Sequence, residues 1–108
     1  MAIVGWGPDF YDAAGYLDPL LAGSKVGDSN FARFDSPRYN QLLARASRLS
    51  GQARDRAYAN LDVELARDAA PLAAFANERQ ITFVSKRVDP RCVVTNPFLD
   101  LAAVCLKR

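Results

Sequence analysis

The sequence lacks histidine altogether among its 108 residues. That absence excludes Ser-His-Asp and Cys-His nucleophilic catalysis and most zinc sites, because histidine serves there as the base or as a metal ligand. An acid-catalysed hydrolase would instead need two of Asp9, Asp12 and Asp18 at a suitable separation, and loop acids this close in sequence are more often solvated or capping residues. We therefore expect a protein that is not an enzyme and that holds no metal or cofactor.

Other features that the sequence lacks exclude further classes of protein. No apolar run approaches the roughly 18 residues that a membrane-spanning helix requires. The Gly5-Trp6-Gly7 stretch lacks the third glycine of a dinucleotide fingerprint. The 14 Lys and Arg and the 12 Asp and Glu residues are spread along the chain and leave a net charge of +2, so there is no basic stripe and we expect no nucleic-acid partner. No signal peptide precedes the first predicted strand, so either the chain is cytosolic or its signal lies upstream.

Two amphipathic helices are the clearest elements in the sequence. Ser36-Pro37 is a helix-start signal, because serine can cap free amides and proline suits the first helical position. A helical repeat of apolar residues predicts helices over residues 36–49 and 52–69, separated by Ser50-Gly51 and paired as a hairpin. Their inward positions are Tyr39, Leu42, Leu43, Ala46 and Leu49 in the first helix and Ala57, Tyr58, Leu61, Leu65 and Ala69 in the second. The charged residues of the second helix, Arg54 among them, mix both signs and predict a solvated face rather than a DNA-reading one.

Short apolar runs predict strands around the hairpin. The candidates cover residues 2–6, 72–76 and 79–84, with shorter ones at 93–94 and 101–106. Residues 11–21 predict one or two short helical turns, and the Gly-, Ser- and Asn-rich stretch 22–30 predicts a surface loop, which is either functional or a plain connection. Length and composition allow one compact domain over residues 1–108. We expect an α/β or α+β fold in which the helical hairpin packs on a small mixed sheet.

The first predicted strand ends in a Trp-x-x-Asp stretch. Trp6 closes the apolar run, and a Gly-Pro turn then places the carboxylate of Asp9 three residues later. Such a turn can aim an aromatic face and an acid into one cavity. From these residues alone, the alternatives are a ligand site, or a core position for Trp6 and a turn-capping role for Asp9.

Several short motifs follow one another along the chain in a recognisable order. They are Gly5-Trp6-Gly7-Pro8-Asp9, Tyr16-Leu17-Asp18-Pro19-Leu20-Leu21, Asn30-Phe31-Ala32-Arg33-Phe34, Ser36-Pro37, Asp68-Ala69-Ala70-Pro71-Leu72 and Ile81-Thr82-Phe83-Val84. In this order and spacing, the chain resembles the C-terminal part of a family 5 extracellular solute-binding protein, a peptide- or nickel-type receptor of an ABC importer. Such receptors are several times longer and have two lobes around a cleft, so the resemblance implies a fragment of one lobe.

The resemblance implies a role in transport. The chain would be part of a type II periplasmic-binding-protein lobe, with some strand edges left unpaired, and would contribute one wall of the ligand cleft. Asp9 matches the acid that holds the α-ammonium group of a bound peptide, and Trp6 would add a flat apolar wall and a cation–π surface. The implied partners are a small peptide or similar small solute and the ABC transporter permease. The implied location is periplasmic or extracellular, with membrane association through the missing N-terminus of the parent.

The two cysteines, Cys92 and Cys105, are too far apart for a CxxC redox motif and too few for a structural zinc site. They are either a disulfide or two buried thiols. Because the chain resembles an exported receptor, and disulfides persist in oxidising compartments, we expect them to form a disulfide that fastens the C-terminal tail.

A different class of function remains open beside the receptor fragment. The helical hairpin could serve as a small protein–protein interaction module with no small-molecule ligand, which a large exposed apolar patch would favour. A receptor fragment would also expose faces that normally meet the rest of its lobe, Leu42, Leu61 and Phe83 among them. We therefore expect self-association of the isolated chain, whereas a closed core would leave a monomer.

Overall fold

The computed structural model of the chain describes residues 3–77, 81–94 and 99–107. The chain divides into two compact units, Met1–Ala74 and Phe75–Arg108, and each is described by itself. The single domain expected over residues 1–108 stays a prediction.

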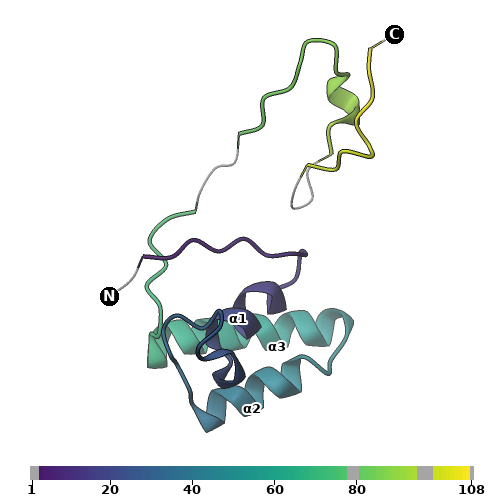
Figure 1. Cartoon of the computed structure of the whole chain (residues 1–108). Coiled ribbons are helices and arrows are strands. Elements are labelled where there is room, and N and C mark those ends of the chain that lie inside the picture. Colours follow the sequence, from purple (N-terminus) through teal and green to yellow (C-terminus); the bar gives the residue numbers. More distant parts are fainter. Residues whose placement is uncertain (1–2, 78–80, 95–98, 108) are drawn as a thin grey trace. The chain divides into compact units, whose positions relative to one another are not determined.

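The first unit is helical (Figure 1). Its elements are α1 (Ala14–Leu21), the 3-10 turn η1 (Gly23–Lys25), α2 (Pro37–Ala46), α3 (Gly51–Glu64) and the π-helical turn η2 (Leu65–Ala69). The two helices predicted at 36–49 and 52–69 are present as α2 and as α3 with η2, and differ from the prediction only at their ends. The short helical turn predicted within 11–21 is α1.

Local chemistry sets where these helices begin and end. Pro37 lies in the first turn of α2, where a missing N–H costs nothing, and Gly51 begins α3 with a φ of 53°, which glycine adopts without strain. The C-terminal end of α3 and η2 is closed by Ala70, whose φ of 42° is left-handed. The N–H of Ala70 donates to the carbonyl of Leu65 at 2.7 Å. Pro71 follows and disfavours helical geometry in the residue before it, so the helix stops here.

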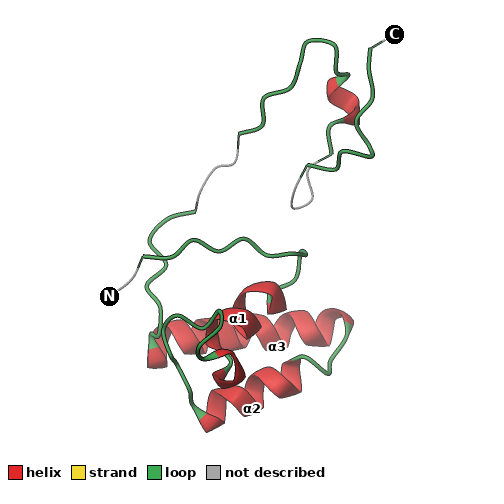
Figure 2. Cartoon of the chain, in the orientation of Figure 1, coloured by secondary structure: helices red, strands yellow, loops and turns green. Residues whose placement is uncertain are grey.

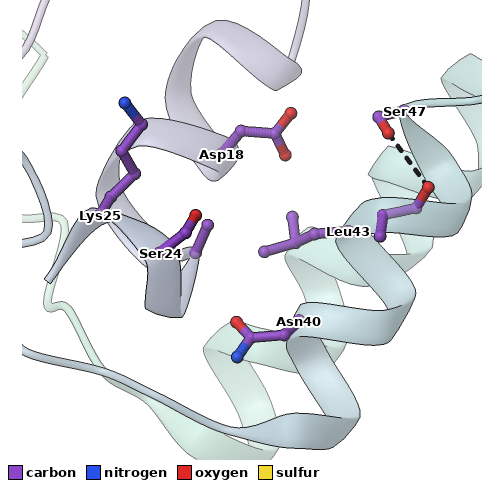
Figure 3. A pocket seen from close by; sticks show the side chains of 8 residues that line it. Asp18, Ser24, Lys25, Asn40, Leu43 and Ser47 are labelled. Carbon is purple, nitrogen blue, oxygen red and sulfur yellow. Dashed lines mark hydrogen bonds between the residues drawn. The ribbon is translucent and has the colours of Figure 1, made fainter.

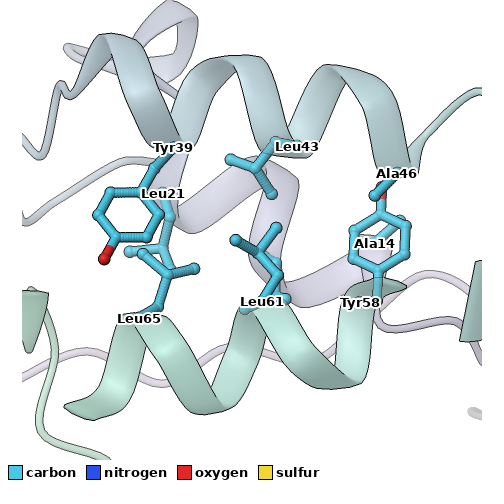
Figure 4. Packing of buried hydrophobic residues seen from close by; sticks show 9 residues of the cluster. Ala14, Leu21, Tyr39, Leu43, Ala46, Tyr58, Leu61 and Leu65 are labelled. Atoms are coloured by element: carbon cyan, nitrogen blue, oxygen red, sulfur yellow. The ribbon is translucent and has the colours of Figure 1, made fainter. Parts of the chain in front are cut away.

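The core of the first unit lies between α1, α2 and α3 (Figure 4). Tyr39 and Leu43 of α2 face Leu61 and Leu65 of α3 in this view. The buried cluster consists of Ala14, Leu17, Leu21, Tyr39, Leu43, Ala46, Tyr58, Leu61 and Leu65, with Leu42, Ala57 and Ala69 partly buried against it. The helical periodicity therefore predicted the inward faces correctly except at Leu49, which lies beyond the end of α2 and is exposed.

A buried amide side chain, that of Asn30, makes three hydrogen bonds within the loop between α1 and α2. Asn30 is 1% exposed, and its Nδ2 donates to the carbonyls of Ala22, at 3.0 Å, and Phe34, at 2.7 Å. Its Oδ1 accepts from the N–H of Phe34 at 3.1 Å. A buried amide whose donors and acceptor are all satisfied fixes the backbone around it. The predicted surface loop is thus an ordered connection.

The predicted α/β fold is wrong. In the part of the chain that the structure describes there is no strand (Figure 2), and the β pairs in which both residues are described are two isolated bridges, Val26 with Asn30 and Val88 with Leu106. A strand needs a neighbouring backbone for its amides and a covered face for its side chains. At 81–84 neither is found among the described residues: these positions form no backbone hydrogen bond to another segment, and Phe83 is 91% exposed. At 101–106 the pairing with other described segments is limited to the bridge at Leu106 and a hydrogen bond that the carbonyl of Cys105 accepts. Residues 2, 79 and 80 of these predicted strands lie outside the described residues.

The second unit contains the predicted disulfide between Cys92 and Cys105. The 3-10 turn η3 (Pro90–Cys92) leads into it. The Asp89 side chain caps this turn by accepting from the N–H of Arg91 at 3.0 Å. The backbone N–H of Asp89 donates to the carbonyl of Cys105 at 2.9 Å, which pairs the segment before η3 with the segment that contains the second cysteine.

The second unit has no apolar core among its described residues. Every large apolar side chain in this part is at least partly exposed, and the most exposed are Phe75, Ile81, Phe83 and Leu101. The unit is therefore held by its cross-link and a few backbone hydrogen bonds rather than by burial of apolar surface.

Candidate functional site

A cavity of about 480 Å³ lies between the N-terminal segment and α1 of the first unit. Its lining includes Trp6, Asp9, Asp18, Lys25, Asp28 and Arg54. The structure thus places Trp6 and Asp9, the two residues predicted to contact ligand, around one cavity. Their role in binding stays a prediction.

The indole of Trp6 is held by a carbonyl that Pro19 leaves free. In an α-helix each N–H donates to the carbonyl four residues earlier, and proline has no N–H, so Pro19 inside α1 leaves the carbonyl of Gly15 without its helical donor. Trp6 Nε1–H donates to this carbonyl at 2.9 Å. The side chain is still 37% exposed and lies outside the core cluster. One edge of the ring is therefore fixed while another part remains accessible.

Glycine at position 15 lets the N-terminal segment cross α1 closely. A Cβ atom there would lie 3.1 Å from Cβ of Pro8 and 3.3 Å from the carbonyl oxygen of Phe10, both tighter than ordinary contacts. The indole hydrogen bond and this close crossing together hold the Trp-x-x-Asp stretch against the helix.

The carboxylate of Asp9 is exposed at this cavity. Among the described residues, no backbone amide or side chain donates a hydrogen bond to it. A turn-capping carboxylate would be satisfied by nearby backbone amides, so the geometry does not have the contacts expected of that alternative. Asp9 can accept hydrogen bonds from a group outside the chain.

Asp12, in contrast, is fully engaged within the chain. Its carboxylate accepts from Nε of Arg54 at 2.8 Å, from Nη2 of the same side chain at 3.3 Å and from the N–H of Ala14 at 2.8 Å. The hydrogen bond from Arg54, and then that from the Ala14 amide, lower the pKa of Asp12 below its usual value. Arg54 Nη1 also donates to the carbonyl of Ser47 at 3.0 Å, so one guanidinium ties together the start of α1, the end of α2 and α3.

Asp18 pairs with a buried tyrosine. The hydroxyl of Tyr58 donates to the carboxylate of Asp18, with O···O distances of 3.0 and 3.2 Å. Burial raises the pKa of Asp18, and burial together with the Asp18 hydrogen bond raises the pKa of Tyr58 to about 12. The Arg54 guanidinium lies 4.9 Å from the centre of the Tyr58 ring, in a cation–π contact.

These contacts show which of the three acids considered for hydrolysis have partners within the chain. Asp12 is held ionised by Arg54 and Asp18 is bound by Tyr58, so two of the three are structural partners of α3. The sequence placed Arg54 on a solvated face, and that prediction is wrong, because its side chain is 21% exposed and bridges three segments. No sequence signal links Arg54 to Asp12, since the two residues lie 42 positions apart.

A second cavity, of about 360 Å³, lies between α1, η1 and α2 (Figure 3). Asp18 also borders this cavity. Three of its four other polar residues are engaged within the chain: Asn40 Oδ1 accepts from the N–H of Gly23 at 2.8 Å and its Nδ2 donates to Asp35 at 2.7 Å, the Ser47 hydroxyl donates to a carbonyl of its own helix, and Lys25 pairs with Asp28. The first cavity is therefore the better candidate for ligand binding.

Replacing Asp18 with asparagine should raise stability at neutral pH but not in acid. The raised pKa of Asp18 means that the folded protein takes up its proton more readily than the unfolded chain, so the ionised carboxylate costs stability above the folded pKa. Below the unfolded value of 3.8 this cost is absent. We expect Asp18→Asn to gain less than about 1 kcal/mol at pH 7 and nothing near pH 3, by urea unfolding. Asp28→Asn, at an exposed acid of the same cavity, is the matched control. An equal gain in stability at pH 7 and pH 3 in Asp18→Asn would contradict the raised pKa of Asp18.

The described residues do not form a metal site: no group of three or more His, Cys, Asp or Glu side chains among them could hold an ion. In the same part of the chain, no helix has the length and apolar content needed to cross a membrane.

No protein-family profile matches the chain. Over 50 residues, which are 46% of this chain, it is 40% identical to a Haemophilus influenzae protein named Heme-binding protein A. The chain spans 9% of the length of that protein. The name of this relative describes a binding protein rather than an enzyme, and the similarity concerns one part of it.

Proposed function

We propose that the chain is a fragment of the substrate-binding component of an ABC importer and contributes one wall of its ligand cleft. The order of motifs along the sequence supports this, as does the local similarity to a protein named for binding a small molecule. The observation that carries the proposal is the cavity where the Trp6 indole, fixed at one edge, and the carboxylate of Asp9 occur together.

The charges around the cavity favour a cationic group on the ligand. Of the two basic residues in the lining, Arg54 is paired with Asp12 and Lys25 with Asp28, at 3.4 Å. Asp9 has no such partner among the described residues. A charge-assisted hydrogen bond between a carboxylate and an ammonium group contributes about 1.5–3 kcal/mol. The ligand class that fits is a peptide, or a similar small solute, with a free amino group.

Heme is the ligand suggested by the name of the relative. Its two propionates are anionic, and the cavity offers them no free cation among its described residues, since Lys25 and Arg54 already have carboxylate partners. A flat ring could still stack against Trp6. We therefore place the peptide first and make heme an outcome of the test.

The same proposal assigns a compartment and a partner. A receptor of this kind would work in the periplasm or outside the cell and deliver its ligand to an ABC transporter permease. The Cys92–Cys105 disulfide supports an oxidising compartment.

Asp9→Asn in the full-length receptor that contains this segment should weaken binding of peptides with a free amino terminus by about tenfold to a hundredfold. The reason is that asparagine keeps the size of the side chain but loses the charge that pairs with the ammonium group. Isothermal titration calorimetry measures the effect. N-acetylated peptides, which lack the ammonium group, should bind equally to both proteins.

Asp28→Asn is the matched control, because Asp28 is an acid of the same cavity that already pairs with Lys25. It should change affinity for the free peptide by less than about threefold. Equal losses for free and acetylated peptides, or no loss for either, would contradict the role of Asp9. Tight hemin binding that Asp9→Asn leaves unchanged, in a protein that binds no peptide, would replace the peptide with heme.

A further inference from the structure

A third cavity of the first unit is an apolar groove between α1 and α3, which we call the α1–α3 groove. Its volume is about 620 Å³, within the usual range for binding pockets. Tyr16 and Leu20 line it from α1 and Ala59 from α3, and Pro71 and Leu72 border it as well. The groove does not share its lining with the Asp9 cavity.

The charged residues of the α1–α3 groove are all acidic. Asp55 and Asp62 line it, and no lysine or arginine does. Within the described residues neither carboxylate takes part in an ion pair. The two acids are seven residues apart on α3, so they lie on one face of the helix, about 10 Å apart along its axis at 1.5 Å per residue.

We propose that the α1–α3 groove binds an amphipathic helix of a partner protein that carries two basic residues seven positions apart. The rise between such residues equals the rise between Asp55 and Asp62, so both ion pairs can form at once. Large apolar side chains at the third and fourth positions after the first basic residue lie on the same face of that helix. They would enter the groove beside Tyr16, Leu20 and Ala59. The arrangement is that of a helix bound in a groove through regularly spaced anchors.

Two other occupants fit the groove less well. An anionic membrane surface would be repelled by Asp55 and Asp62. A second copy of this chain offers Arg38 and Arg45, seven residues apart on α2, but Gln41 holds one of the two positions between them. The other position belongs to Leu42, which packs against the core of its own unit. A second copy therefore supplies the charges without the apolar side chains.

The test uses a fluorescein-labelled, alanine-rich helical peptide with two lysines seven positions apart and leucines at the third and fourth positions after the first lysine. Fluorescence anisotropy with the whole chain at low ionic strength should show saturable binding, which weakens as salt is added because the ion pairs are exposed. Exchanging both lysines for glutamate should weaken binding by at least about tenfold. Asp55→Asn combined with Asp62→Asn should weaken binding of the lysine peptide by about three- to thirtyfold.

The Ala59→Glu variant tests whether the peptide occupies the groove itself or is only attracted by the acidic charge around it. Glutamate would project into the groove and block it while making the surface more acidic, so binding of the lysine peptide should fall by at least about tenfold. Ala53→Glu adds the same charge at an exposed position of α3 that does not line the groove, and should leave affinity unchanged within about twofold. Glutamate is a good helix former, and circular dichroism checks that both variants remain folded.

Several results would overturn the proposal. Equal binding of the lysine and glutamate peptides would remove the role of Asp55 and Asp62, and unchanged binding in Ala59→Glu would place the peptide elsewhere. Binding of phosphatidylglycerol vesicles with no binding of the peptide would assign the groove to a membrane surface. A dimer in sedimentation equilibrium that Ala59→Glu dissociates would assign it to a second copy of the chain.

Discussion

Leu61→Ala is expected to leave most of the first unit unfolded at room temperature. Leu61 is 4% exposed and lies in the cluster that α1, α2 and α3 share (Figure 4). Truncating a buried leucine to alanine removes apolar contacts and leaves a cavity, at a cost of about 2–5 kcal/mol. A single small core rarely supplies more than about 3–5 kcal/mol in total, so the loss is comparable to the whole stability of the unit. Urea unfolding followed by far-UV circular dichroism measures it.

Val63→Ala is the matched control, because Val63 lies on the same helix and is 60% exposed. It removes apolar atoms that water already reaches, so its effect should stay within about 0.5 kcal/mol. Equal losses in the two variants would contradict the packing, as would a Leu61→Ala protein with full helical signal and an unchanged urea midpoint.

Reducing the Cys92–Cys105 disulfide is expected to abolish the backbone pairing of the second unit. A cross-link of this span, with a sequence separation of 13, stabilises a folded state by about 3 kcal/mol in the chain-entropy model. The described residues of the unit include no buried apolar side chain that could compensate. Amide hydrogen exchange should therefore lose protection at Asp89 and Lys107, whose N–H groups bond to the carbonyls of Cys105 and Arg87.

The control for this experiment is the Cys92→Ser/Cys105→Ser double variant, which should match the reduced protein and be indifferent to reductant. The amide of Leu61 should keep its protection in every sample, because its helix belongs to the first unit. Protection of Asp89 and Lys107 that survives reduction would contradict the role of the cross-link. Two free thiols titrated in unreduced native protein would contradict the disulfide itself.

The sequence determined the two long helices almost completely. Ser36-Pro37 marks the start of α2, and the repeat that includes Leu43, Leu61 and Leu65 marks the buried faces. Such signals are readable because a helix satisfies its own backbone, so a helical segment needs only an apolar face to pack. The strands were predicted wrongly for the opposite reason. Their hydrogen-bond partners must come from elsewhere in the chain, and a short apolar run such as Ile81–Val84 does not say whether a partner exists.

The candidate site likewise contains some contacts that local sequence predicts and others that only the packing of distant segments creates. The sequence placed Trp6 and Asp9 together because Asp9 lies three positions after Trp6, across the Gly7-Pro8 turn. Pro19 also carries a local signal, since its missing N–H frees the carbonyl that holds the Trp6 indole. The pairing of Arg54 with Asp12 joins residues 42 positions apart, and that of Tyr58 with Asp18 joins residues 40 apart.

The long-range pairs were decided by the tertiary structure. Packing of α3 against α1 brings the two acids of the N-terminal part, Asp12 and Asp18, to the basic and hydroxyl groups of α3. It thereby leaves Asp9 as the acid of the three without a partner among the described residues. The sequence by itself determined which residues could carry charge at the cavity. The fold decided which of those charges remains available to a ligand, because a carboxylate is neutralised or left free by the groups that packing places within hydrogen-bond distance.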